Sequence, residues 1–479
     1  MLVVLTGCSQ ILGIGGFQVG DAGGDAGPAF AQRTYLKASN PDPGDNFGVA
    51  VALSADGATL AVAAYQEASA AMGVDGDQTS NAKAAAGAVY IFARTGDTWA
   101  QQAYLKASNP DAMDQFGRSL SLSADGNTLA VGADGEASIV TGVGGIQTGN
   151  TAAAAGAVYV FARTATTWAQ TTYIKASNTG AADHFGYAVA LSGDGATLAV
   201  GAPLEDGSTP GINGASTETA SSAGAAYIFA LGPTTWSQAA YVKASNPTAA
   251  DRFGNALALS FDGATLAVAA PFEDSASKGV NGNQTNELAT DAGAVYIFTH
   301  ATTWSQQAYL KAANTEANDR FGISLALAAD GNTLAVGADG DDSSSATAPD
   351  DNTATDSGAV HLFARAGTSW SESAFVKAVA PAAMDSFGAA VALSPTNLVV
   401  GAPNEQSSTG SLALFDLAGA SLAHLTATNA GTGDKLGISV AASTDTFAAG
   451  ALAEDSSASG IDGDGALDDA TDSGAAYLF

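Results

Sequence analysis

The chain has 479 residues, 47 of them acidic and 16 basic, and a formal net charge of −31 at pH 7. A charge of this sign repels nucleic acid and anionic lipid headgroups, which excludes both as partners of the folded surface. Hydrophobic residues make up 46% of the chain, enough for a large core, but no apolar run reaches the roughly 18 residues of a bilayer span. Cys8 is the single cysteine, which rules out an internal disulfide.

The N-terminal segment, residues 1–8, ends in Leu5–Cys8 (LTGC). This tetrapeptide resembles the lipobox of bacterial lipoprotein signal peptides. The resemblance implies acylation of Cys8 and a lipid anchor in the bacterial cell envelope, at the outer membrane or cell surface. Because a basic segment and a longer apolar run are missing, we expect the signal to start upstream; the alternative is a chance free cysteine. Residues 9–29 are rich in glycine and are predicted to form a flexible tether.

A Phe-Gly pair recurs about every 68 residues through the rest of the chain. Its copies are Phe47-Gly48, Phe116-Gly117, Phe185-Gly186, Phe253-Gly254, Phe321-Gly322, Phe387-Gly388 and the softened Leu436-Gly437. A fixed period of this length indicates that one repeat is one supersecondary unit. Any function is then expected to arise from a surface that the repeats build together.

One repeat, residues 45–109, illustrates the predicted elements. Residues 49–54 alternate as a strand does, and Asp56-Gly57 predicts a tight hairpin turn into a return strand at 59–63. A polar loop leads to a third strand at 87–92, and a fourth follows at 103–106. The repeat is therefore predicted to be four antiparallel strands.

Aromatic residues recur at fixed positions of the repeat. The third strand ends in phenylalanine in every copy, and all tryptophans share one position: Trp99, Trp168, Trp236, Trp304 and Trp370. We expect both sets to pack between sheets rather than to bind a ligand. A lysine such as Lys106 follows each tryptophan, and we expect it to reach over a neighbour toward water or to pair with a local carboxylate.

The two ends of the repeat array complement each other. The last repeat stops at Phe479, after its third strand, whereas residues 30–40 carry the pattern of an isolated fourth strand. A circle in which the N-terminal strand completes the last blade removes the exposed edge of an open array. Residues 30–479 are therefore predicted to be one all-β, seven-bladed propeller, with an open β-solenoid as the alternative.

Gly-Ala-Pro follows the second strand at residues 201–203 and 401–403. Together with the Phe-Gly pairs, this pattern resembles FG-GAP repeats, the units of integrin α-subunit propellers and of many bacterial surface proteins. The resemblance implies a propeller with calcium in the first hairpin of a blade. Here five of these hairpins keep only an Asp-Gly, as in Asp56-Gly57, and a single carboxylate cannot hold calcium. These hairpins are predicted to be structural turns.

An aspartate stands two residues before every Phe-Gly or Leu-Gly pair. The set is Asp45, Asp114, Asp183, Asp251, Asp319, Asp385 and Asp434. We predict that each carboxylate accepts hydrogen bonds from turn amides.

The connections between the second and third strands are long, polar and varied, and they share one face with the connections between blades. Long irregular loops on a rigid scaffold are where binding usually resides, although solvated spacers are the alternative. The last of these loops contains Asp462, Asp464 and Asp468, which resemble the inner part of the calcium motif and form the candidate Ca²⁺ site.

No enzyme signature is visible. The histidines, His184, His300, His361 and His424, share no repeat position and no metal-ligand spacing. We therefore expect a non-catalytic, monomeric binding or adhesion module that meets the membrane only through its lipid anchor and presents the acidic loop face to a protein or glycan. The alternatives are a surface-layer scaffold without a discrete ligand and an extracellular enzyme with a site assembled from loops.

Overall fold

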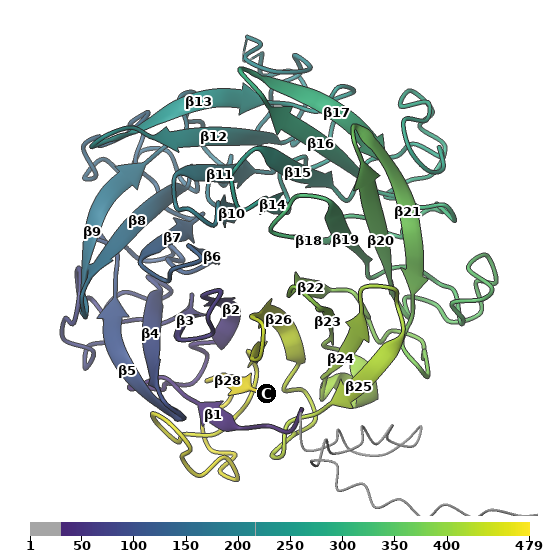
Figure 1. Ribbon diagram of the computed structural model, residues 1–479. Helices are drawn as coiled ribbons and strands as arrows, with labels where there is room; N and C mark the ends of the chain where they lie inside the picture. The colour runs from purple at the N-terminus through teal and green to yellow at the C-terminus, as the bar shows by residue number, and fades with distance from the viewer. Residues whose placement is uncertain (1–29, 216) are drawn as a thin grey trace, which may run out of the picture.

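A computed structural model describes residues 30–215 and 217–479, which form seven four-stranded antiparallel sheets arranged in a ring (Figure 1). In the sheet that closes the ring, β1 (Thr34–Leu36) pairs antiparallel with β28 (Ala475–Leu478). The N-terminal strand therefore completes the blade that contains the C-terminus. The predicted seven-bladed β-propeller with this closure is confirmed, and the open solenoid is excluded. Closure covers the outer edge of β28 and gives the last blade the same four strands as the others.

In the first six blades the strands follow the chain from the inner to the outer position, and in the seventh the outer strand is the N-terminal β1. The first blade is β2 (Phe47–Leu53), β3 (Thr59–Ala64), β4 (Ala88–Thr95) and β5 (Thr98–Leu105). The second is β6 (Ser119–Leu122), β7 (Thr128–Ala133), β8 (Ala157–Thr164) and β9 (Thr167–Ile174). The third is β10 (Ala188–Leu191), β11 (Thr197–Ala202), β12 (Ala225–Leu231) and β13 (Trp236–Val242). The fourth is β14 (Leu257–Leu259), β15 (Thr265–Ala270), β16 (Ala294–His300) and β17 (Trp304–Leu310).

The remaining blades keep the same order. The fifth is β18 (Ser324–Leu327), β19 (Thr333–Ala338), β20 (Ala359–Ala366) and β21 (Ser369–Val376). The sixth is β22 (Ala390–Leu393), β23 (Asn397–Ala402), β24 (Ser411–Asp416) and β25 (Ser421–Leu425), with the turn α1 (Glu405–Ser408) inside it. The seventh is β26 (Leu436–Ala442), β27 (Phe447–Ala451), β28 and β1. No helix in the described ranges has the length and apolar character to cross a membrane.

The fourth strand is longer than predicted. In the first blade it begins at Thr98 rather than at Ala103, and Trp99 pairs with Arg94. A β-bulge between Ile91 and Phe92 shifts the register, which lets the strand continue through the polar residues that obscured it in the sequence.

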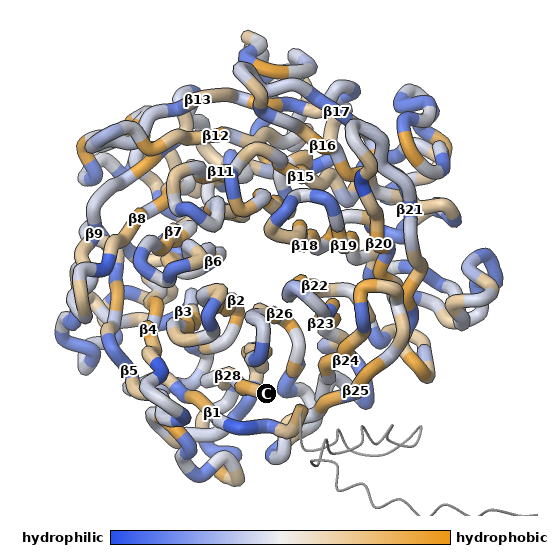
Figure 2. Tube along the Cα trace, in the orientation of Figure 1, coloured by the Kyte–Doolittle hydropathy of each residue, from blue (hydrophilic) through white to orange (hydrophobic). Residues whose placement is uncertain are grey.

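The core lies within the blades and between neighbouring blades. Figure 2 shows apolar residues along the strands, whereas the connections are mostly polar. Phe116 lies edge-on to Tyr159 and Phe161, with ring centroids 5.4 and 5.9 Å apart. Trp168 is buried against apolar residues of the preceding blade and donates its Nε1–H to Gln102 there at 2.9 Å. The predicted packing role of the recurrent aromatics is confirmed.

The Phe-Gly and Gly-Ala-Pro motifs meet across a blade boundary. A Cβ added to Gly201 of the third blade would lie 2.0 Å from the carbonyl oxygen of Gly254 in the fourth. This separation is far inside van der Waals contact, so close approach of the two backbones requires glycine here. The sequence motif is therefore an inter-blade contact.

Both sets of recurrent aspartates have the predicted structural roles. In the first hairpin, Asp56 Oδ1 accepts hydrogen bonds from the Ser54 hydroxyl and the Ala58 amide. Asp45 Oδ2 accepts from the Asp42 amide at 3.0 Å. The same bond from a turn amide recurs at Asp114, Asp183, Asp251, Asp319, Asp385 and Asp434. Burial raises the pKa of Asp45 to about 7, although its backbone hydrogen bond opposes the shift.

The strand-end lysines do not reach water, so that part of the expectation was wrong. Lys106 is fully buried and pairs with Glu67, which follows β3, at 2.7 Å. Glu67 Oε1 also accepts from Asn40, whose own side-chain oxygen accepts from the Tyr90 hydroxyl. Equivalent pairs at 2.7–3.0 Å are Lys37–Glu454, Lys175–Glu136, Lys243–Glu205, Lys311–Glu273 and Lys377–Asp341. A lysine at the end of a blade's fourth strand and an asparagine in the connection before that blade thus bind the same carboxylate.

The long loops are ordered against the outer strands. In five blades the loop forms an antiparallel bridge with the end of the fourth strand. The bridges are Val74–Leu105, Val143–Ile174, Ile212–Val242, Val280–Leu310 and Ile461–Leu36. Each of these connections is thus fixed at one point to the outer edge of its blade. A ligand-binding role for the long loops stays a prediction.

Candidate functional site at the channel mouth

One backbone position carries the same unusual conformation in every blade. The residue immediately before each Phe-Gly or Leu-Gly pair has a φ between 55° and 60°, in the left-handed region. These residues are Asn46, Gln115, His184, Arg252, Arg320, Ser386 and Lys435. Non-glycine residues seldom adopt this conformation, and they cluster at functional sites when they do. The seven side chains form what we call the mouth ring, on the face that bears the long loops.

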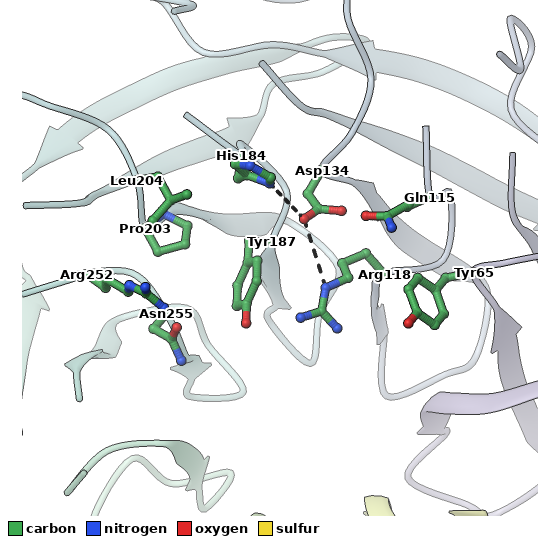
Figure 3. Close-up of a pocket in the computed structure, with 10 residues that line it drawn as sticks. All are labelled: Tyr65, Gln115, Arg118, Asp134, His184, Tyr187, Pro203, Leu204, Arg252 and Asn255. Atoms are coloured by element: carbon green, nitrogen blue, oxygen red, sulfur yellow. Dashed lines mark hydrogen bonds and ion pairs between the residues drawn. The ribbon is translucent and has the colours of Figure 1, made fainter. Parts of the chain in front are cut away.

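Three members of the mouth ring, Gln115, His184 and Arg252, line a pocket of about 330 Å³. The other lining residues either follow the second strands of the first three blades or precede the first strands of the second, third and fourth. They are Tyr65, Arg118, Asp134, Tyr187, Pro203, Leu204 and Asn255 (Figure 3). The pocket thus spans several blades, and four of its residues, Tyr65, Asp134, Pro203 and Leu204, are the first residues of the long connections. It lies on the predicted face, at the base of the predicted segments.

Arg118 stands at the centre of this pocket. Its guanidinium carbon lies 4.5 Å from the Tyr187 ring centroid and 5.9 Å from that of Tyr65, and Figure 3 shows it between the two rings. Its Nε is 3.9 Å from Asp134 Oδ2. Within the described residues no protein atom accepts a hydrogen bond from the guanidinium, which keeps 30% of its side-chain surface exposed. The group is therefore held in place by aromatic contacts while its donors stay available.

The Arg252 guanidinium is also available to a ligand, and a comparison with the next blade explains why. At the same repeat position, Arg320 is neutralised by Asp339 at 2.8 Å and Asp356 at 3.5 Å. The residue that corresponds to Asp339 beside Arg252 is Pro271, which carries no charge. Arg252 rests instead on the Phe272 ring at 4.6 Å. Arg252 therefore lacks the close ion pair of Arg320, although the charge of Asp291, at the repeat position of Asp356, still acts on it.

His184 and Asp134 complete the polar wall of the pocket. Asp134 is 4% exposed, and its Oδ2 lies 3.1 Å from His184 Nδ1. The other carboxylate oxygen is buried without a hydrogen-bond partner among the described residues. This site was not predicted from the sequence, because the pattern Asp-x-Phe-Gly was interpreted only as a structural motif. The available signal was the x position, which varies between Asn, Gln, His, Arg, Ser and Lys inside an otherwise constant pattern.

The candidate calcium ligands have hydrogen-bonding roles in the structure. Asp462 Oδ1 accepts the Tyr35 amide at 2.9 Å, and Asp464 Oδ1 accepts the Ala466 amide. At the position of Asp462, other blades use Asp75 or Asn281 for the same bond, so the position requires an acceptor and not a charge. In the described ranges no group of three or more His, Cys, Asp or Glu side chains is arranged to hold a metal ion. Calcium binding at Asp462, Asp464 and Asp468 stays a prediction.

The other histidines lie away from the pocket. His361 and His424 occupy tyrosine positions of β20 and β25, as the sequence indicates, and His300 contacts Trp304 in a tilted arrangement with ring centroids 5.2 Å apart. Cys8 and the tether at residues 9–29 lie outside the described residues, so acylation stays a prediction.

The fold and the inter-blade glycine contacts define a seven-bladed β-propeller. The family model of the FG-GAP repeat matches residues 99–161, 168–229, 304–363 and 370–415, and the chain therefore carries FG-GAP repeats. Each match runs from a tryptophan in the fourth strand of one blade to a phenylalanine in the third strand of the next. The sequence repeat is thus displaced from the blade by one strand. No curated protein matches the chain significantly.

Proposed function

We propose that this protein is a non-catalytic binding module of the bacterial cell surface, whose mouth-ring face takes a protein or glycan ligand. The observation that carries the proposal is Arg118, which is fixed between two tyrosine rings in a pocket and has no hydrogen-bonded partner within the described residues. Preorganised polar groups in a concave site are the usual basis of specific binding. The lipobox resemblance of Leu5–Cys8 supports a lipid anchor, and the FG-GAP repeats support an integrin α-like binding role by analogy of fold.

The proposal is tested by displaying the protein on beads and measuring their retention on cells and on arrayed proteins and glycans. We expect saturable retention that Arg118→Ala reduces about tenfold or more. Arg163→Ala is the matched control, because Arg163 stacks on Trp168 at the opposite end of the second blade. Equal retention of both variants, or retention without saturation, would favour the scaffold alternative.

An enzymatic function is a second candidate because Asp134 orients His184 beside Tyr187 in the pocket. A histidine positioned by a carboxylate is the common arrangement of a general base or acid. The test is turnover of the ligands found in the binding assay, followed by mass spectrometry. Product formation that is lost in His184→Gln, with binding retained, would make the protein an enzyme.

A further inference from the structure

We infer that the pocket at the channel mouth binds a glycan end-on through one carboxylate-bearing sugar, with Arg118 and Arg252 as the anion-recognising residues. This inference rests on the proposed binding function and specifies its ligand class. It depends on the charge of the pocket, on the polar groups around the two guanidinium groups, and on the acidic surface outside.

The pocket is basic in a strongly acidic chain. The lining groups include two arginines and a histidine against a single carboxylate, Asp134, whereas the whole chain has 47 acidic and 16 basic residues. Six of the lysines are buried in ion pairs and cannot meet a ligand. Available positive charge is therefore scarce on this molecule, and the pocket concentrates it. A planar guanidinium with free donors matches a carboxylate better than any neutral group.

The remaining lining groups favour a sugar over a peptide. Gln115 and Asn255 each bring a donor and an acceptor to the pocket wall. Several hydroxyl groups on one rigid ring can pair with such a set, whereas a peptide carboxylate brings few further polar groups. The half-buried rings of Tyr65 and Tyr187 line the pocket and offer apolar contact to the ring carbons. The pocket volume of about 330 Å³ is at the small end for ligand sites, which suits a terminal unit.

The surroundings limit the ligand to a single charge near its end. The loops on this face carry carboxylates, among them Asp206, Glu218 and Asp291. A polymer with an acid group on every sugar would place further negative charges against these loops, and like charges repel. A glycan that ends in one acidic sugar avoids this repulsion.

The test is calorimetric titration of the full chain with methyl glucuronide, methyl galacturonide and sialyllactose, against methyl glucoside and lactose as neutral counterparts. We expect at least one acidic probe to bind at least tenfold more tightly than its neutral counterpart. Acetate and sulfate are the controls for free anions, and an acetylated glutamate amide is the control for peptide carboxylates. We expect each of them to bind more weakly than the acidic sugar.

Matched variants locate the binding. Arg252→Ala is expected to weaken acidic-sugar binding about 10-fold to 100-fold, as the loss of one charge-assisted hydrogen bond predicts. Arg320→Ala, at the same repeat position but already ion-paired, is expected to leave it unchanged. Equal affinity for acidic and neutral sugars would overturn this inference and leave the binding function standing. Tighter binding of the glutamate amide than of the acidic sugars would also overturn the inference, and so would the absence of binding by every acidic probe. If the bead assay also showed no saturable retention, the proposed binding function would be overturned too.

Discussion

The first and sixth blades have the same four-stranded sheet but different buried polar groups. In the first blade, Glu67 is 1% exposed and accepts from the fully buried Lys106 at 2.7 Å. In the sixth, no lysine is present, and Glu405 pairs with His424, whose side chain is 42% exposed, at 3.1 Å. The asparagine that joins the first blade to its neighbour is replaced before the sixth by Ala380. Strand pairing therefore does not require the network.

The difference shows which part of the repeat forms the blade and which part joins it to its neighbour. Both blades retain the Phe-Gly pair and the phenylalanine of the third strand, and Phe387 lies 5.8 Å from Phe415 as its counterparts do. Only the sixth blade lacks the buried lysine and has a short connection with left-handed residues at Gln406 and Ser407. We infer that the sixth blade is the least firmly joined, and four predictions examine this comparison.

The largest effect is expected from Lys106→Met. The variant leaves the Glu67 carboxylate buried without its charge partner, which costs about 3–5 kcal/mol in the free energy of unfolding. Urea denaturation followed by circular dichroism measures the loss. The double variant Lys106→Met/Glu67→Leu is expected to recover most of it, because an apolar pair of similar size is often neutral. If Lys106→Met alone lowered the free energy of unfolding by less than about 1 kcal/mol, the buried ion pair would not account for a difference in stability between the two blades.

Asn109→Ala is expected to have a smaller effect. Asn109 donates to Glu136 at 3.2 Å and accepts from Tyr159 at 2.7 Å across a blade boundary. Its removal leaves buried partners unsatisfied, with a loss of about 1–3 kcal/mol. The control is Ala380→Asn, expected to be neutral within about 0.5 kcal/mol because the sixth blade lacks the tyrosine and lysine partners. Equal losses in both variants would contradict the assigned role.

The buried aspartates predict a pH dependence. Burial raises the pKa of Asp45 to about 7 and that of Asp319 to about 8. A carboxyl whose folded pKa is raised binds more protons in the folded state, so its contribution to stability falls as pH rises from about 4 through its folded pKa. We expect the melting temperature to fall from pH 5 to pH 8, and to fall less in Asp45→Asn, whose amide oxygen can accept the same bond. A melting temperature that rises over this range would contradict the prediction.

The smallest effect is expected at His424. Its hydrogen bond to Glu405 raises the pKa of this imidazole above 6.5 although burial opposes the shift. Its stabilisation is thus present at pH 6 and lost as pH rises through the folded pKa, by under about 1 kcal/mol for an exposed pair. Hydrogen exchange of residues 411–425, corrected for intrinsic rates, is expected to show more opening at pH 8. His424→Gln is expected to abolish this difference, and His300→Gln to retain it.

Most of the fold could be predicted from the sequence because its signals are local and repeat. An Asp-Gly pair such as Asp56-Gly57 marks a hairpin by itself, and the seven copies of the Phe-Gly or Leu-Gly pair set the number of blades. The orphan strand at residues 30–40 predicted the closure that the β1–β28 pairing confirms. The predicted start of β5 was wrong because a bulge disrupts the alternation of apolar and polar residues on which the prediction depends.

The partners of these residues could not be predicted, because they come from distant parts of the chain. The alternation, turns and period of the sequence by themselves determined an all-β ring of seven blades. Only the tertiary structure decided that Lys106 is buried on Glu67, that Asp462 serves a backbone amide, and that Arg118 lies between Tyr65 and Tyr187. Strand patterns depend on neighbours along the chain, whereas a pocket between blades depends on residues that meet only when the ring is closed.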